Sequence, residues 1–127
     1  MLEKSTEKPL PVFLRAAFIG CIIGLASLTW LPANVLTRTS LGGHAEHFIA
    51  YLGTSILMGL TFQKSPRLAV QCSLLIIYAA ILEAGQLYSP GRHASLQDLA
   101  FSSAGIVIGG LFLWMARTRM LGLLKID

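Results

Sequence analysis

The chain has 127 residues, of which 54% are hydrophobic and only 13% are charged. Soluble domains usually carry about 25% charged residues, so this composition excludes an ordinary soluble domain and fits a chain that is solvated mostly by lipid. The formal net charge is +4, but the Lys and Arg residues flank apolar runs without interleaved aromatics, which argues against a nucleic-acid-binding protein.

Four apolar runs follow one another along the chain, at about residues 12–31, 44–62, 68–88 and 96–116. Each is about 20 residues long, the length that an α-helix needs to cross the hydrocarbon of a bilayer. The connections between the runs contain the Pro, Gly and Ser residues that interrupt helices, and the runs lack the polar stripe of a soluble amphipathic helix. The pattern predicts an all-α fold, in which residues 1–127 form one integral membrane four-helix bundle.

The first run could be a signal peptide, because basic residues precede it. Its apolar core is long for a signal peptide and no clear cleavage site follows, so we expect an uncleaved span. Lys and Arg accumulate in cytoplasmic segments, and only Arg38 and Arg92 fall on one side of the predicted bundle. The other side, which includes both termini, carries Lys4, Lys8, Arg15, Lys64, Arg67, Arg117, Arg119 and Lys125. Both termini are therefore predicted to be cytoplasmic.

Two pairs of glycines have the GxxxG spacing that allows helix backbones to approach closely: Gly20 with Gly24, and Gly105 with Gly109. We expect both pairs to support packing inside the bundle. Cys21 and Cys72 lie within apolar runs and have no paired spacing, so they are expected to be buried small residues rather than a disulfide or a zinc site.

Polar and ionisable residues gather at the outward ends predicted for the second, third and fourth spans. Three segments would bring an imidazole, two carboxylates, an amide and a guanidinium to one layer of the membrane. Ionisable groups at this depth are costly, so they indicate a functional site by default. The predicted ligand-binding residues are His47, Tyr51, Glu83, Gln86, Arg92, Ser95 and Asp98.

Some of these residues also have structural interpretations. Ser95 and Asp98 have the spacing of a capping box, with Asp in place of the usual Glu. Arg92 could form an ion pair with Glu83 or Asp98 that locks the helix ends together. His44 and Glu46 fall in the same layer, and His44, Glu46 and Arg92 could alternatively be interfacial residues in contact with water. Glu46 and His93 are interpreted as surface charges.

One histidine and two carboxylates, His47, Glu83 and Asp98, would suit a divalent ion. The sequence has no HExxH motif and no local spacing of metal ligands, so we predict no metal. It also has no glycine-rich phosphate loop and no GxSxG nucleophile motif, and no other cofactor is predicted.

The order of the polar residues resembles that of the VanZ-like family of small bacterial membrane proteins. The resemblance covers about residues 43–110 and is carried by His47-Phe48-x-x-Tyr51, Glu83-x-x-Gln86, Arg92-x-x-Ser95-x-x-Asp98 and Gly105. The chain departs from the family at Gly43 and His44, where Asp-Lys is frequent, and at Ser102, where Asn is frequent. The resemblance implies a multi-pass protein of the bacterial cytoplasmic membrane and a link to resistance against the glycopeptide antibiotic teicoplanin.

Two classes of function remain open. In the first, an outward-facing polar cleft binds a membrane lipid, a lipid-linked cell-wall precursor or a glycopeptide-type amphiphile. Arg92 suits phosphate or carboxylate, and Glu83 and Asp98 would hold Arg92 or a substrate amine. In the alternative, the chain is a membrane-embedded enzyme that acts on a lipid or lipid-linked substrate. Glu83 and His47 would then serve as acid and base, and Asp98 is a further catalytic candidate.

Overall fold

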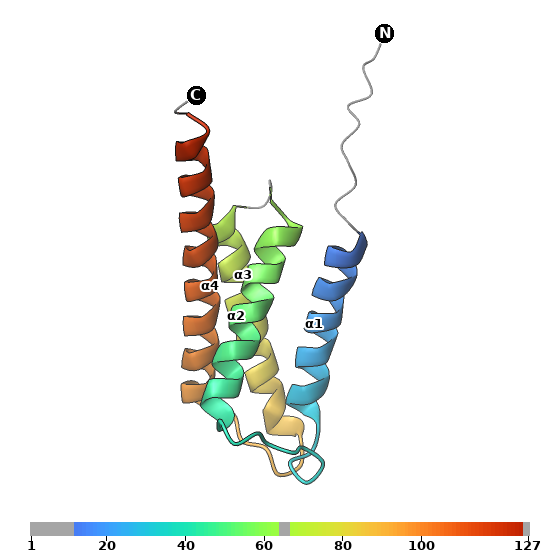
Figure 1. The fold of residues 1–127 in the computed structure, drawn as a ribbon. Coiled ribbons are helices and arrows are strands. Elements are labelled where there is room, and N and C mark those ends of the chain that lie inside the picture. Colours follow the sequence, from blue (N-terminus) through green and yellow to red (C-terminus); the bar gives the residue numbers. More distant parts are fainter. Residues whose placement is uncertain (1–11, 64–66, 126–127) are drawn as a thin grey trace.

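The computed structural model describes residues 12–63 and 67–125. Over these residues the fold is all-α, with the helices α1 (Val12–Trp30), α2 (Gly43–Thr61), α3 (Leu68–Gly85) and α4 (Leu96–Leu123). A short 3-10 helix, η1 (Gln86–Tyr88), follows α3 directly. The helices run up and down, so that α1 begins and α4 ends at the same end of the molecule (Figure 1). The prediction of an all-α four-helix bundle is confirmed.

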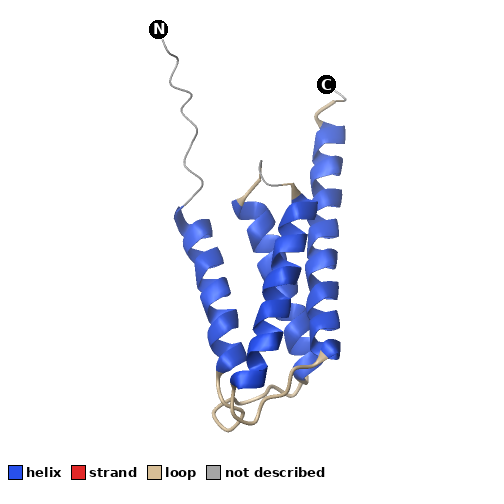
Figure 2. Cartoon of the chain, turned by 180° about the vertical axis from the view of Figure 1, so that it is seen from behind, coloured by secondary structure: helices blue, strands red, loops and turns tan. Residues whose placement is uncertain are grey.

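The connections between α1 and α2 and between η1 and α4 gather at the opposite end (Figure 2). Gly42 precedes α2 with a φ of 84°, and Gly91 has a φ of 73° in the connection to α4. Both values lie in the left-handed region that favours glycine, so these two residues allow the chain to turn sharply there. The end of the bundle that carries the predicted polar site is therefore built from two tight connections.

The fourth helix is longer than the predicted span. It continues to Leu123, about two turns beyond the predicted end at residue 116. Arg117 and Arg119 are good helix formers, so the helix does not stop where the apolar run stops. Arg117 Nη2 donates to the carbonyl of Gly59 at 2.6 Å, which satisfies an acceptor that the C-terminal end of α2 leaves open.

Among the described residues, three helices are long and apolar enough to cross a membrane, namely α1, α3 together with η1, and α4, which indicates a multi-pass membrane protein. α2 was predicted to be a fourth membrane span, but it is not one of these three helices. It has the same length as α1, 19 residues, so its length is not the reason. Its first turns carry His44, Glu46 and His47, which lower its mean hydropathy. α2 also buries Ser55 and Thr61 against its neighbours. Its polar side chains are therefore directed largely at other parts of the protein.

The most extensive helix contact joins α2 and α4, and it confirms the packing role of the second glycine pair. A Cβ atom on Gly105 would collide with the carbonyl oxygen of Phe48, and one on Gly109 would lie 3.0 Å from the carbonyl oxygen of Leu52. These two glycines therefore let the backbones of α2 and α4 touch, which places the outward ends of the two helices side by side.

The first glycine pair does not pack inside the bundle, so that expectation was wrong. A Cβ atom on Gly20 or Gly24 would meet nothing within 4 Å. The reason is that α1 makes few packing contacts with the other helices, and Thr29 is its one buried residue. One of these contacts is a hydrogen bond of 2.6 Å from the Tyr78 hydroxyl to the carbonyl oxygen of Ile22.

Candidate functional site

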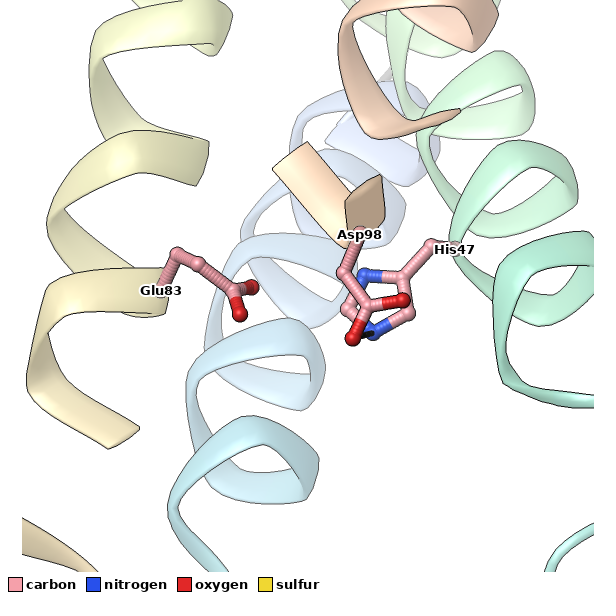
Figure 3. Close-up of side chains that lie close together, drawn as sticks. All are labelled: His47, Glu83 and Asp98. Carbon is pink, nitrogen blue, oxygen red and sulfur yellow. Dashed lines mark ion pairs between the residues drawn. The ribbon is translucent and has the colours of Figure 1, made fainter. Parts of the chain in front are cut away.

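Three helices bring one histidine and two carboxylates together at the loop end of the bundle (Figure 3). His47 comes from α2, Glu83 from α3 and Asp98 from α4, and we call these three residues the His–Glu–Asp cluster. One ring nitrogen or carboxylate oxygen of each lies within 4.8 Å of the corresponding atoms of the other two. Glu83 is buried, whereas the side chains of His47 and Asp98 are 20% and 17% exposed. The cluster therefore has a buried side and a side that solvent reaches.

The imidazole of His47 has different surroundings at its two nitrogens. Nδ1 lies 3.2 Å from the hydroxyl oxygen of Ser102, which is fully buried on α4. Nε2 lies 3.9 Å from Oδ2 of Asp98, a distance too long for a hydrogen bond. Ser102 therefore orients the ring, and Nε2 faces Asp98 without being bonded to it.

Two side chains satisfy the backbone at the start of α4. The hydroxyl oxygen of Ser95 accepts a hydrogen bond from the N–H of Asp98 at 3.3 Å, as the capping-box spacing predicted. The N–H of Ser95 donates to Oε1 of Glu83 at 2.6 Å. In a capping box that second bond goes to the acidic residue three positions later. Because Glu83 of α3 accepts this hydrogen bond in place of Asp98, the Asp98 side chain can make other contacts.

The Asp98 carboxylate lies beside two histidines, His44 and His47. Its Oδ1 atom lies 2.8 Å from Nδ1 of His44, and its Oδ2 atom faces His47. The His44 ring also stacks on Phe101, with 4.9 Å between the ring centroids and 15° between the planes. His44 is half exposed and belongs to the outward polar layer in which the sequence placed it, but its direct contact with Asp98 was not predicted.

Arg92 contacts carbonyl and amide oxygens rather than a carboxylate. Its Nη2 atom donates to the carbonyl of Thr29 at 3.3 Å. When the Gln86 amide is oriented so that both its nitrogen and its oxygen are hydrogen-bonded, Arg92 Nη2 also donates to the Gln86 oxygen at 3.3 Å. The ion pair considered for Arg92 with Glu83 or Asp98 is not formed, and Arg92 is instead directed at the end of α1. Within the described part of the chain, Arg92 Nε is buried and has no acceptor.

Glu46 holds the connection between α1 and α2. Its Oε1 atom accepts hydrogen bonds from the backbone N–H of Thr39, at 2.7 Å, and from the hydroxyl of the same residue. These bonds tie the connection to the first turn of α2. Glu46 therefore has a structural role at this connection.

Two cavities adjoin each other beside the cluster. The smaller has a volume of about 160 Å³, and its polar lining residues are Arg38, Glu46, His47, Gln86, Arg92, His93 and Asp98. The larger has a volume of about 290 Å³, lies between α1 and α2, and is lined in part by Leu25, Leu28, Ala50 and Tyr51. Leu36, Glu46, His47 and Arg92 line both cavities. A polar compartment therefore lies directly beside a more apolar one.

The predicted site residues fall into three groups. His47, Gln86, Arg92 and Asp98 line the polar cavity, and Tyr51 lines the apolar one. Glu83 lies in the cluster but does not line either cavity, and Ser95 caps α4.

The structure adds His44, Ser102 and Arg38 to the site. The helical spacing was a signal for two of them. His44 lies one turn before His47, and Ser102 lies one turn after Asp98, so each shares a helix face with a predicted residue.

Comparison of the chain with protein-family models, with curated proteins and with solved structures found no match. The resemblance to the VanZ-like family therefore rests on the order and spacing of the polar residues. The function is inferred from the geometry of the cluster and of the two cavities.

Proposed function

We propose that this chain is a multi-pass protein of the bacterial cytoplasmic membrane that binds the anionic headgroup of an amphiphile in an outward-facing polar cleft. The observation that carries the proposal is the polar cavity beside the more apolar one between α1 and α2. A headgroup would lie in the first cavity, and the start of an acyl chain would lie in the second. This division matches the chemistry of a lipid or a lipid-linked molecule.

Two guanidinium groups favour an anionic headgroup. Arg38 and Arg92 both line the polar cavity, and the planar fork of arginine suits phosphate and carboxylate oxygens. Buried N–H groups are almost always hydrogen-bonded, so the unpaired Nε of Arg92 is a donor that a bound anion could engage after a small side-chain movement. Membrane lipids, lipid-linked cell-wall precursors and glycopeptide-type amphiphiles are the candidate ligands. The VanZ-like resemblance extends the proposal to antibiotic resistance.

The outward orientation rests on the distribution of basic residues. In the described part of the chain, Arg38 and Arg92 lie at the end that carries the cluster. The basic residues toward the other end are Arg15, Arg67, Arg117, Arg119 and Lys125. Lys4, Lys8 and Lys64, which also entered the prediction, lie outside the described residues. The asymmetry in the described residues points the same way as the full count and favours a cytoplasmic location for both termini.

Cysteine labelling tests this orientation. In a variant with Cys21→Ala and Cys72→Ala, an impermeant maleimide should label Ala94→Cys in intact spheroplasts, because residue 94 lies in the exposed loop at the cluster end. The matched variant Lys125→Cys should be labelled only after the membrane is opened. The reverse pattern would place the cluster on the cytoplasmic side and overturn the proposed orientation.

Lipid retention tests the binding function. Wild-type protein purified in a mild detergent should retain an anionic lipid, detected by native mass spectrometry. Arg92→Gln should reduce its occupancy about tenfold or more, because a hydrogen bond to a charged group contributes about 1.5–3 kcal/mol. Arg119→Gln is the matched control, since Arg119 is exposed near the far end of α4. Equal occupancy in all three proteins would remove Arg92 from the proposed binding site.

A membrane-embedded enzyme is the second candidate, and the orientation of His47 favours it. With Nδ1 held by Ser102, Nε2 faces Asp98 and could exchange a proton with a lipid substrate. The same mass spectra distinguish the two candidates. A retained lipid that is converted to a product of different mass during incubation supports the enzyme, whereas an unchanged lipid supports binding alone.

A further inference from the structure

We infer that the His–Glu–Asp cluster binds one divalent transition-metal ion, with Zn²⁺ as the expected ion. Zinc accepts imidazole nitrogen and carboxylate oxygen, and three protein ligands with a fourth open position are typical of its reactive sites. The imidazole disfavours Mg²⁺ and Ca²⁺, which prefer oxygen ligands. The inference concerns the ion alone and does not depend on the identity of the amphiphile. It revises the prediction from sequence, which found no local spacing of metal ligands.

The orientation of His47 is that of a metal-binding histidine. Such residues usually donate their second ring N–H to a neighbouring acceptor, which fixes the tautomer and the plane of the ring. In the tautomer in which Nδ1 donates to the buried hydroxyl of Ser102, at 3.2 Å, Nε2 carries a free lone pair and lies 3.9 Å from Oδ2 of Asp98. Ser102 is therefore a positioning residue for the ligand atom.

The two carboxylates are held in the same manner. Oε1 of Glu83 accepts the N–H of Ser95, which leaves its other oxygen available. Oδ1 of Asp98 contacts His44, which leaves Oδ2 directed at His47. Each ligand thus has one atom engaged by the protein and a second atom available to an ion, the arrangement in which outer partners orient metal-binding groups.

The charges of the cluster also favour a cation. Glu83 is 7% exposed and has another carboxylate, Asp98, within its cluster, while Arg92 is bonded elsewhere. Burying like charges is costly, and His44 compensates Asp98 only when its ring is protonated. A divalent ion would neutralise both carboxylates. The ligand atoms lie within 4.8 Å of one another. Tetrahedral zinc with bonds of about 2.0–2.2 Å holds its ligand atoms about 3.4 Å apart, so the most distant pair would have to close by about 1 to 1.5 Å when the ion binds.

Zinc binding to the purified protein tests the inference. The protein is prepared with Cys21→Ala and Cys72→Ala, because both thiols are free and could take zinc elsewhere, and with an affinity tag that lacks histidine. After treatment with a chelator, it is titrated with ZnCl₂ in lipid-free detergent, and bound zinc is measured by equilibrium dialysis and elemental analysis. We expect about one zinc ion per chain, a loss of affinity of at least tenfold in His47→Ala, and a similar loss in Asp98→Asn.

Two further variants make the result specific. His93→Ala is the matched control, because His93 is an exposed loop histidine outside the cluster, and it should keep wild-type affinity. Ser102→Ala leaves every ligand in place but should weaken zinc binding about 10- to 100-fold, as expected for the loss of an outer partner. Wild-type affinity in Ser102→Ala or in His47→Ala would overturn the inference.

A thermal readout covers the possibility that His47→Ala folds poorly. An ion that binds only the folded state raises the unfolding temperature, so ZnCl₂ should stabilise the wild type and His93→Ala but not His47→Ala or Asp98→Asn. Circular dichroism and size exclusion establish whether each variant is folded before titration. Absence of zinc binding and of stabilisation in the wild type would refute the ion site and leave the lipid experiment unaffected.

Discussion

Replacing Gly105 with leucine is expected to remove most of the folded protein from the membrane, with at least a tenfold loss of abundance. A Cβ atom at this position would collide with the carbonyl oxygen of Phe48, and it would lie 3.0 Å from the backbone nitrogen of Leu52. Both neighbours are backbone atoms of α2, so they can move only if the whole helix moves. Overpacking typically costs about 1–3 kcal/mol, and a collision with backbone atoms belongs at the upper end of that range. This is a large part of the stability of a small protein.

Gly20→Leu is the matched control, because a Cβ atom there would meet nothing within 4 Å. It makes the same chemical change in a helix of the same bundle and should leave abundance within about twofold of the wild type, since surface substitutions usually cost under 0.5 kcal/mol. Abundance is measured by quantitative immunoblotting of isolated membranes. Equal abundance of the two variants would show that α2 and α4 do not pack through Gly105.

Glu83→Gln and Glu83→Ala should separate the charge of this residue from its hydrogen bond. Oε1 of Glu83 accepts the N–H of Ser95 at 2.6 Å. An amide oxygen can accept the same bond, so Glu83→Gln should keep near-normal abundance and lose at least tenfold in zinc affinity. Alanine leaves the Ser95 N–H without its acceptor, and it should also lower stability by about 1–3 kcal/mol.

The readouts for this pair are membrane abundance, the unfolding temperature without metal, and zinc affinity. Wild-type zinc affinity in Glu83→Gln would remove Glu83 from the ion site. If Glu83→Gln instead destabilised the protein as much as Glu83→Ala, the negative charge itself would be structural. Protection of a sensitive Gram-positive host against teicoplanin is a further readout, in which Glu83→Gln should abolish protection if the wild-type chain first confers it.

The positions of the helices and the cap of α4 were predictable because they depend on local chemistry. Apolar runs of membrane-spanning length gave the positions of α1 to α4, and the Ser95 hydroxyl caps α4 as its spacing to Asp98 predicted. The packing role of Gly105 and Gly109 was also predicted. These features are set by residues within one or two turns of each other.

The partners of the site residues were less predictable, because they depend on how each helix is rotated and tilted against the others. Glu83 accepts a hydrogen bond from the first residue before α4, a helix that follows it in the chain. The Asp98 carboxylate therefore contacts His44 and His47 instead. Arg92 was expected beside a carboxylate, but the end of α1 approaches it and supplies the carbonyl of Thr29 instead. The small contact surface of α1 likewise could not be inferred from its composition, which is as apolar as a packed helix.

The most direct test of the central claim, that three helices form an outward polar site for an anionic headgroup, is a crystal structure of the protein grown in a lipid mesophase doped with an anionic lipid. The predicted result is headgroup density in the polar cavity beside Arg92, with His47, Glu83 and Asp98 converging next to it. Lipid bound only along the outer faces of the helices, with His47 or Glu83 directed away from Asp98, would contradict the claim.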